Sequence, residues 1–331
     1  GISPGAINWW GSGDVENNLT VVEKPSGIPC GFLYEMTDFQ QVLDAFETQI
    51  KFFAKWHMTN TNLFEHIMQQ ELPVPVVSAT MDGCMERGRD VMFGGAKYQS
   101  LGVSSVGIGT CADSLQMIKH LCFDTKMCTT RELYNAIMSN WEGYEELRQY
   151  ILNEAPHYGN GDPEIDKYVG WISDLFADSI NELESPYCHY TAGTFPVTLN
   201  TVYGSFTSAT PDGRKKGDPL SDGISPVQGM DRSGPTALLS SVSQINCYKY
   251  ANGTLMNMKF TPTAIQGENG ISKLIALLKT YFFRLGGMEI QINIVDADTL
   301  KDAKKHPEDY QNLVVRVAGF STYFVMLTES S

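Results

Sequence analysis

The spacing of apolar side chains along the chain predicts several amphipathic helices. Apolar residues recur at helical intervals over residues 39–53, after a capping box that Thr37 forms with Gln40. Thr129 and Glu132 form a second capping box and predict the start of another helix. The remaining predicted helices occupy residues 112–123, 162–184, 271–284 and 299–305.

Runs of β-branched residues predict the strands. They fall at residues 73–77, 289–295 and 313–317, and the last run resumes at residues 322–325. Strands that alternate with helices along a chain favour an α/β architecture with parallel strands. No internal repeat or linker divides the sequence, so we expect residues 1–331 to belong to one structural unit.

The composition suits a protein with a sizeable apolar core. The chain has 331 residues, of which 42% are hydrophobic. Its formal net charge of −14 argues against a surface that binds nucleic acid or an anionic membrane. No apolar stretch approaches the roughly 20 residues needed to span a bilayer, and Gly1 opens no signal-peptide pattern. We therefore expect a cytoplasmic protein that binds neither nucleic acid nor membranes.

The motifs that hold metals and nucleotides are missing from the sequence. The seven cysteines include no Cys-x-x-Cys pair, which argues against structural zinc and a self-contained iron–sulfur site. A phosphate-binding Gly-x-x-x-x-Gly-Lys-Ser/Thr loop is also missing. We expect reduced thiols, no metal site and no bound cofactor.

Gly319 interrupts the last β-branched run, and two interpretations of it stay open on this segment alone. A glycine between two strands commonly permits a positive φ in a turn. Glycine also has an α-carbon that can hold an unpaired electron by delocalisation into the amide groups on either side. A side chain would oppose the planar geometry that such a radical needs.

Several other segments of the chain are too particular in sequence to be ordinary loops. They are GTFPV (193–197), ATPDGR (209–214), LSDGISP (220–226), NGTLMNMKF (252–260), QINIVD (291–296), HPEDY (306–310) and RVAGF (316–320). In this order they resemble the carboxy-terminal part of the glycyl radical enzymes, the family of pyruvate formate-lyase and the radical diol dehydratases. The resemblance extends from about residue 27 to residue 327.

The resemblance implies a fold and a radical mechanism. The family fold is an α/β barrel of ten strands wrapped by helices, of which this chain would be the C-terminal part, with the glycyl radical loop region at about residues 290–331. Gly319 would store the radical, and a cysteine on a second loop would become a thiyl radical. A radical S-adenosylmethionine activating enzyme would install the Gly319 radical without a bound cofactor. A homo-oligomer and a small-molecule substrate are also implied, and the fragment alone is expected to be inactive.

The family's cysteine loop has the pattern Gly-Cys-x-Glu, and residues 83–86 match it. The surrounding sequence resembles a later family segment, however, and the separation from Cys84 to the glycine is short. We therefore expect the thiyl cysteine upstream of this chain, with Cys84 in that role only if no upstream loop exists. Glu86 is a candidate acid/base or substrate contact, and an ion pair with Arg87 or Arg89 is the alternative.

The implied reaction is a radical lyase reaction with two open forms, decarboxylation of an arylacetate such as 4-hydroxyphenylacetate or dehydration of a small polyol. Phe195 is a candidate wall of the substrate pocket, and together with Trp9 and Trp10 it tilts the choice towards an apolar substrate. One alternative is a formate acetyltransferase like pyruvate formate-lyase. The other is a non-catalytic partner that supplies a glycyl radical domain.

Overall fold

The computed structural model describes residues 27–186, 188–195, 197–317 and 320–327. The α-helices are α2 (Phe39–Glu71), α3 (Pro75–Thr80), α4 (Cys84–Arg87), α5 (Ile108–Ile118), α6 (Thr130–Met138), α7 (Glu145–Asn153), α8 (Pro163–Asn181), α9 (Leu199–Phe206), α10 (Pro235–Val242), α11 (Gly267–Phe283) and α12 (Ala297–Lys305). The strands are β1 (Ser100–Ser104), β2 (His189–Gly193), β3 (Asn257–Phe260), β4 (Gln291–Ile294), β5 (Val314–Val317) and β6 (Phe320–Tyr323).

Helix α2 begins one residue later than the capping box predicted. Asp38 is the N-cap, and its carboxylate accepts a hydrogen bond of 2.9 Å from the Gln40 backbone N–H. Gln41 supplies the reciprocal contact, because its side-chain oxygen accepts from the Asp38 N–H at 3.3 Å, and it also accepts from the Thr37 N–H at 2.8 Å. The sequence therefore predicted the helix correctly, but Asp38 rather than Thr37 is its N-cap.

The predicted strand at residues 73–77 is wrong, because this segment enters helix α3. Pro75 occupies the first helical position, where its fixed φ suits a helix and its missing N–H costs nothing. The Asp90 carboxylate then accepts from the Val74 N–H at 3.0 Å and from the Ser78 hydroxyl at 2.8 Å. Asp90, which lies 16 and 12 positions from its two partners, therefore stabilises a helix where the β-branched run predicted a strand.

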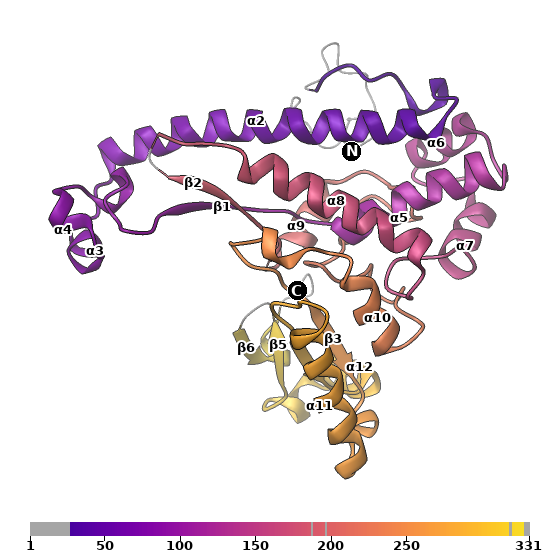
Figure 1. Cartoon of the computed structure of the whole chain (residues 1–331). Coiled ribbons are helices and arrows are strands. Elements are labelled where there is room, and N and C mark those ends of the chain that lie inside the picture. The colour runs from indigo at the N-terminus through magenta and orange to yellow at the C-terminus, as the bar shows by residue number, and fades with distance from the viewer. Residues whose placement is uncertain (1–26, 187, 196, 318–319, 328–331) are drawn as a thin grey trace.

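The core lies where α5 and α8 pack together below α2, as Figure 1 shows. Leu115 and Ile118 of α5 and Val169 of α8 are almost completely buried. Helix α5 starts before its predicted range and continues into a π-helical turn, η3 (Lys119–Asp124), which places Leu121 in the core. The predicted helices that correspond to α2, α5 and α8 thus pack together in one layer.

The strands form a series of two-stranded sheets. The pairs β1–β2 and β3–β4 are parallel, and an isolated parallel bridge between Thr194 and Thr254 joins the first pair to the segment that leads into β3. The pair β5–β6 is antiparallel. The predicted parallel α/β arrangement is therefore confirmed for the first four strands, and in the described residues the series does not close into a barrel.

Figure 1 shows two regions, a helical layer that contains α2, α5 and α8 and a lower region that contains β3 to β6, α11 and α12. Within the described ranges, no helix has both the length and the apolar character needed to cross a membrane. The lower region carries the strands on both sides of the singled-out glycine, so the candidate site is built from there.

Candidate functional site

Strands β5 and β6 flank Gly319 in sequence and pair with each other. Val317 lies opposite Phe320 in the antiparallel register. Gly319, like Trp9 and Trp10, lies outside the described residues, so its predicted role is not tested by the geometry. The residues that hold the two flanking strands in place lie within the described ranges, and they form the candidate site.

The side chain of Asn293 holds strand β5 at Arg316. Its amide NH₂ donates to the Arg316 carbonyl at 2.9 Å, and its amide oxygen accepts from the Arg316 N–H at 2.9 Å. One side chain thus satisfies both backbone groups of that residue, as a neighbouring strand would. Since Asn293 lies on β4, this contact attaches the β5–β6 hairpin to the parallel pair β3–β4.

Replacing Asn293 with alanine will loosen this attachment. The Arg316 N–H loses its partner, and a lost backbone hydrogen bond of this kind costs about 1 kcal/mol. Hydrogen exchange at the Arg316 amide of the complete protein should therefore become roughly fivefold faster. The matched control is Asn312→Ala, an exposed asparagine just before the hairpin. Equal exchange in the two variants would contradict the assigned support.

A second chain of hydrogen bonds continues from β4 to residues 220–226. Gln291, which is 5% exposed, donates from its side chain to the Asn257 side-chain oxygen at 2.7 Å. Asn257 is the register partner of Gln291 on β3, and its side-chain NH₂ donates to Asp222. The Asn257 N–H donates to the Ser225 hydroxyl at 2.9 Å. The strand pair is therefore tied to the 220–226 segment through side chains as well as backbone.

Two carboxyl groups of this cluster hold their protons more tightly than exposed ones. Burial raises the pKa of Asp222 to about 6, although the Asn257 hydrogen bond and the Lys259 charge oppose the effect. One Asp222 oxygen is buried without a hydrogen-bond partner among the described residues. Burial also raises the pKa of Glu289, whose carboxylate accepts from the Met256 N–H at 3.0 Å. A carboxyl group with a raised pKa keeps its proton to a higher pH than an exposed one, which suits a role in acid/base chemistry.

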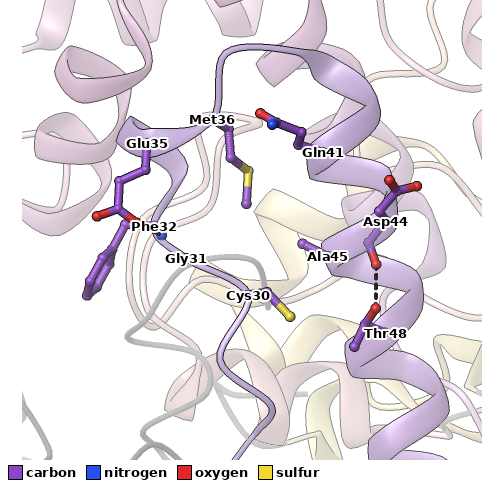
Figure 2. Close-up of a pocket in the computed structure, with 9 residues that line it drawn as sticks. All are labelled: Cys30, Gly31, Phe32, Glu35, Met36, Gln41, Asp44, Ala45 and Thr48. Carbon is purple, nitrogen blue, oxygen red and sulfur yellow. Dashed lines mark hydrogen bonds between the residues drawn. The ribbon is translucent and has the colours of Figure 1, made fainter.

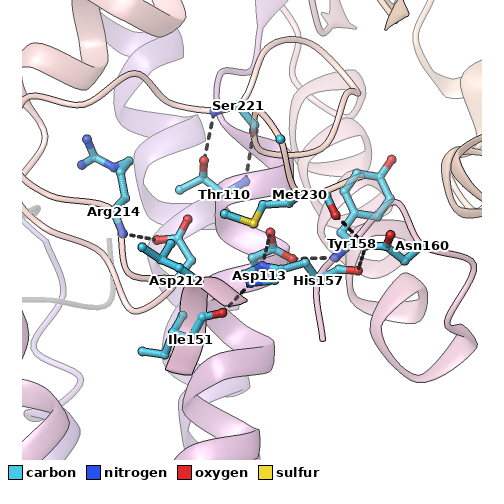
Figure 3. Close-up of polar contacts among 12 residues, drawn as sticks. Thr110, Asp113, Ile151, His157, Tyr158, Asn160, Asp212, Arg214, Ser221 and Met230 are labelled. Atoms are coloured by element: carbon cyan, nitrogen blue, oxygen red, sulfur yellow. Dashed lines mark hydrogen bonds and ion pairs between the residues drawn. The ribbon is translucent and has the colours of Figure 1, made fainter. Parts of the chain in front are cut away.

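The 220–226 segment is fixed to the helical layer on its other side, as Figure 3 shows. Thr110 and Ser221 exchange hydrogen bonds, each backbone N–H donating to the other's hydroxyl, at 3.0 and 2.9 Å. The Tyr158 hydroxyl donates to the Ile224 carbonyl at 2.8 Å. A β-carbon at Gly109 would lie 2.8 Å from the Ser225 carbonyl oxygen, so the close contact requires glycine there. The segment thus links α5 to the candidate site.

The buried Asp113–His157 pair, also in Figure 3, holds α5 against the segment between α7 and α8. The His157 ring reaches Asp113 at 3.1 Å through Nδ1 and the Ile151 carbonyl at 2.7 Å through Nε2. Both partners are acceptors, so the site suits the protonated ring, in which both nitrogens donate. Burial lowers the pKa of His157, but the hydrogen bond and charge of Asp113 outweigh it, and the net pKa is raised. All partners are protein groups, which indicates a structural role.

Cys84 and Glu86 lie on α4, at the far end of α2 and well away from β5 and β6 in Figure 1. Cys84 is 2% exposed. The Glu86 carboxylate accepts from the Gly83 N–H at 3.0 Å and thereby caps α4. The Arg87 guanidinium donates to the Ala96 carbonyl at 2.7 Å, and the choice between the candidate role of Glu86 and an ion pair with Arg87 or Arg89 stays a prediction.

Phe195 follows strand β2 and is half-buried. Its backbone N–H donates to the Ser104 hydroxyl at 3.0 Å. A β-carbon at Gly193 would lie 2.8 Å from the Phe195 ring, so the ring packs directly on glycine backbone. The ring is therefore held by the end of β2, where it can serve as an apolar wall.

Two hollows lie elsewhere in the described structure, and none of the residues that support β5 lines them. Figure 2 shows the smaller, of about 350 Å³, between the segment before α2 and the first turns of α2. Glu35, on the segment before α2, lines this hollow, and its carboxylate accepts from the Phe32 N–H at 2.9 Å. The larger hollow, of about 700 Å³, lies beside α4 and is lined by Arg87, Gly94, Ala96, Lys97, Tyr98, Gln99, Ser100, Ser185, Cys188, His189 and Thr191. Neither hollow is lined by Cys84, Glu86 or Phe195.

Sequence reasoning missed the roles of Asp222, Asn257, Gln291 and Asn293. All four lie within segments that the sequence singled out, but only as marks of resemblance. Their partners are separated by 23 to 35 positions along the chain. The available signal was a set of amides in otherwise apolar strands, where a buried polar side chain needs a partner.

Comparisons with known proteins match almost the whole chain. Residues 21–204 match a family model described as pyruvate formate lyase-like, and residues 220–325 match one described as glycine radical. The chain is 36% identical over 300 residues to a probable dehydratase, YbiW, of Escherichia coli strain K12, across 88% of this chain and 37% of that protein. It is 34% identical over 312 residues to the trans-4-hydroxy-L-proline dehydratase of Clostridioides difficile, across 94% of this chain and 39% of that protein.

A solved structure agrees with these matches. The glycerol-bound B12-independent glycerol dehydratase of Clostridium butyricum is similar with a TM-score of 0.89 and 34% identity, over 99% of this chain and 41% of that chain. The chain thus spans about two fifths of the length of the proteins that it matches. This likeness confirms the predicted fold class, with the chain as part of the larger fold.

Proposed function

The chain belongs to the pyruvate formate lyase-like family of glycyl radical enzymes, and on that premise we propose that the complete protein is a radical lyase that dehydrates a small polyol. The observation that carries the proposal is the position of Gly319. It lies in the RVAGF segment, inside the part of the chain that matches the glycine radical model. Glycine alone lacks the side chain that opposes a planar α-carbon radical.

In this proposal Gly319 stores the radical between turnovers. A cysteine thiol gives its hydrogen atom to the Gly319 α-carbon, and the resulting thiyl radical takes a hydrogen atom from the substrate. After water leaves, the product radical recovers a hydrogen atom from that cysteine, which then regains one from Gly319. Atoms and electrons balance without an external oxidant. We place the thiyl cysteine in a part of the complete protein outside this chain, with Cys84 as the candidate if that part has no Gly-Cys-x-Glu loop.

Other residues of the chain have supporting roles in the proposal. Asn293 positions β5, and Phe195 supplies an apolar wall of the substrate pocket. Glu86 remains a candidate acid/base or substrate contact, although its carboxylate caps α4 in this structure. A hydroxyl group that leaves as water needs a proton. The raised pKa values of Asp222 and Glu289 support dehydration, because Glu289 interacts with Arg316 of β5 and Asp222 is linked to β4 through Asn257, so both can hold protons in this part of the fold.

Dehydration is favoured because the proteins compared above are dehydratases by name. Decarboxylation of an arylacetate, acyl transfer of the formate acetyltransferase type and a non-catalytic role as a glycyl radical partner are the alternatives. The proposal also includes a radical S-adenosylmethionine activating enzyme as partner, a homo-oligomeric complete protein and a cytoplasmic location.

The test is anaerobic activation of the complete protein with a radical S-adenosylmethionine activating enzyme. We expect an electron paramagnetic resonance doublet from the Gly319 α-hydrogen. The activated protein is then given propane-1,2-diol or glycerol, 4-hydroxyphenylacetate, or pyruvate with coenzyme A, in separate reactions. Formation of an aldehyde and water from a polyol supports the proposal.

The other outcomes contradict it in different ways. Release of carbon dioxide from 4-hydroxyphenylacetate makes the protein a decarboxylase, and acetyl transfer to coenzyme A makes it a formate acetyltransferase. A doublet without any turnover favours the non-catalytic role. An activated protein that shows no doublet overturns the role of Gly319 itself.

A further inference from the structure

Two cysteines lie side by side at the edge of the helical layer. Cys122 belongs to the π-helical turn η3, and Cys128 lies two positions before the first residue of α6. Their sulfur atoms are 3.9 Å apart, and both thiols are free. The side chains of both are half-buried, while residues 124–127 between them are exposed. The pair is therefore close together and open to a small reagent.

The backbone between the two cysteines is already folded back on itself. The Cys128 N–H donates to the Leu121 carbonyl at 3.3 Å, and the Thr125 N–H donates to the His120 carbonyl at 2.9 Å. Lys126 has a φ of 54°, which reverses the chain direction. A disulfide has an S–S distance of about 2.05 Å, so its formation requires the sulfurs to approach within a loop that is already closed.

The two thiols differ in character. The hydrogen bond from the Cys122 thiol lowers the pKa of Cys128, although burial and the Glu132 charge oppose this effect. The same hydrogen bond, together with burial, raises the pKa of Cys122. Cys128 also precedes the N-terminus of α6, where the helix dipole favours a thiolate. Cys128 is thus suited to attack first, and Cys122 to follow.

We propose that Cys122 and Cys128 form a redox-active dithiol that closes into an intramolecular disulfide by exchange with a small soluble disulfide, such as glutathione disulfide. The Cys128 thiolate attacks one sulfur, the S–S bond of glutathione disulfide breaks, and one glutathione thiol leaves. Cys122 then attacks the Cys128 sulfur of the mixed disulfide, and the second glutathione thiol leaves. The protein loses two electrons and two protons, and glutathione disulfide is reduced to two thiols.

The second step is helped by the first. Once Cys128 is bonded to glutathione, it no longer accepts the hydrogen bond that raises the pKa of Cys122. The attacking thiol is then already next to the sulfur that it must reach. The remaining described cysteines lack this arrangement. Cys84, Cys188 and Cys247 are buried, burial raises the pKa of Cys111, and the Cys30 sulfur contacts the Ile28 carbonyl and the Gln49 side chain rather than a second thiol.

Peptide mapping of the complete protein tests this proposal. The protein is incubated anaerobically in glutathione buffers of increasing oxidation, its free thiols are alkylated, and it is digested with trypsin. Cleavage after Lys119, Lys126 and Arg131 separates peptides 120–126 and 127–131, so only a disulfide keeps them together. We expect this linked pair, lighter by two hydrogen atoms than its parts and separated by dithiothreitol.

Variants distinguish a dithiol from independent thiols. In Cys122→Ser, glutathione should remain attached to Cys128, and in Cys128→Ser no linked pair should form. The control Cys111→Ser should give the linked pair as the unchanged protein does. Alkylation of Cys128 should be at least about tenfold faster than that of Cys111 at neutral pH.

Two results would overturn the proposal. One is recovery of peptides 120–126 and 127–131 as separate alkylated peptides in the most oxidising buffer. The other is a glutathione adduct that persists on Cys128 in the unchanged protein, because Cys122 then fails to displace it. Neither result bears on Gly319, so the failure of this proposal is distinct from failure of the radical mechanism.

Discussion

Replacing Gly319 with alanine in the complete protein will abolish both the electron paramagnetic resonance doublet and turnover. The alanine methyl group opposes the planar α-carbon that the radical needs. It also replaces one of the two hydrogen atoms on the α-carbon that exchanges hydrogen in the radical cycle. Because the radical is proposed to start every turnover, we expect activity below about one ten-thousandth of normal, equivalent to more than about 5 kcal/mol in the barrier. The measurements are the resonance spectrum after anaerobic activation and the rate of substrate loss.

A glycine far from the site provides the control. Gly143 is exposed between α6 and α7, has a φ of 80° and has no other atom within 4 Å of where a β-carbon would lie. Gly143→Ala therefore costs about 1 kcal/mol of backbone strain without touching the hairpin. It should keep both the doublet and turnover. A Gly319→Ala protein that still gave the doublet would show that the radical resides elsewhere.

Replacing Arg214 with methionine will produce the largest loss of stability that we expect from a residue outside the glycine hairpin. Arg214 is 5% exposed, and its guanidinium donates to the carbonyls of Thr207 at 3.0 Å and Asp218 at 2.5 Å, among others. Methionine fills much of the same space but leaves these carbonyls without their donor, and it removes the positive charge that lowers the pKa of the buried Asp212. Breaking a buried charged cluster in this way costs about 3–5 kcal/mol.

Urea unfolding of the complete protein measures the effect of Arg214→Met. The midpoint should fall by about 1–3 M if the slope lies near 2 kcal/mol per M. Arg284→Met, at an exposed arginine after α11, is the control and should change the midpoint little. Arg214→Lys should fall between the two, because lysine keeps the charge but not the planar donor fork. Equal midpoints for the two methionine variants would refute the assigned role.

Local chemistry made several helices predictable from the sequence. Thr129 and Glu132 exchange the predicted capping contacts, with the Glu132 N–H donating to the Thr129 hydroxyl at 3.1 Å. Asp162 caps α8 directly before Pro163, at the start of the predicted helix 162–184. The prediction failed at residues 73–77, where the contacts with Asp90 that stabilise α3 come from a distant part of the sequence. Capping depends on neighbours in sequence, whereas that contact depends on the fold.

Only one part of the candidate site, the RVAGF motif, could be predicted from the sequence. Gly319 stood out because its segment resembles a known one, and its role remains a prediction. The support from Asn293 was not visible, because it requires β4 and β5 to lie side by side in the fold. The same holds for Gln291 and Asn257, which meet only when β3 and β4 pair. A sequence shows which amides need partners, but the pairing of strands decides which partners they meet.

The junction between the helical layer and the lower region has a consequence for cooperativity. The contacts across it include the isolated bridge at Thr194 and Thr254, the hydrogen bonds from Asn257 to Asp222 and Ser225, and one from the Ile224 N–H to the Leu255 carbonyl. Met256, Met258 and Tyr281 also belong to the same buried core as α5 and α8. Elements that share a core unfold together, whereas an attachment made by few hydrogen bonds opens with its own, smaller free energy. We therefore expect β3 and β4 to unfold together with α5 and α8, and Asn293 to set how readily the β5–β6 hairpin opens first.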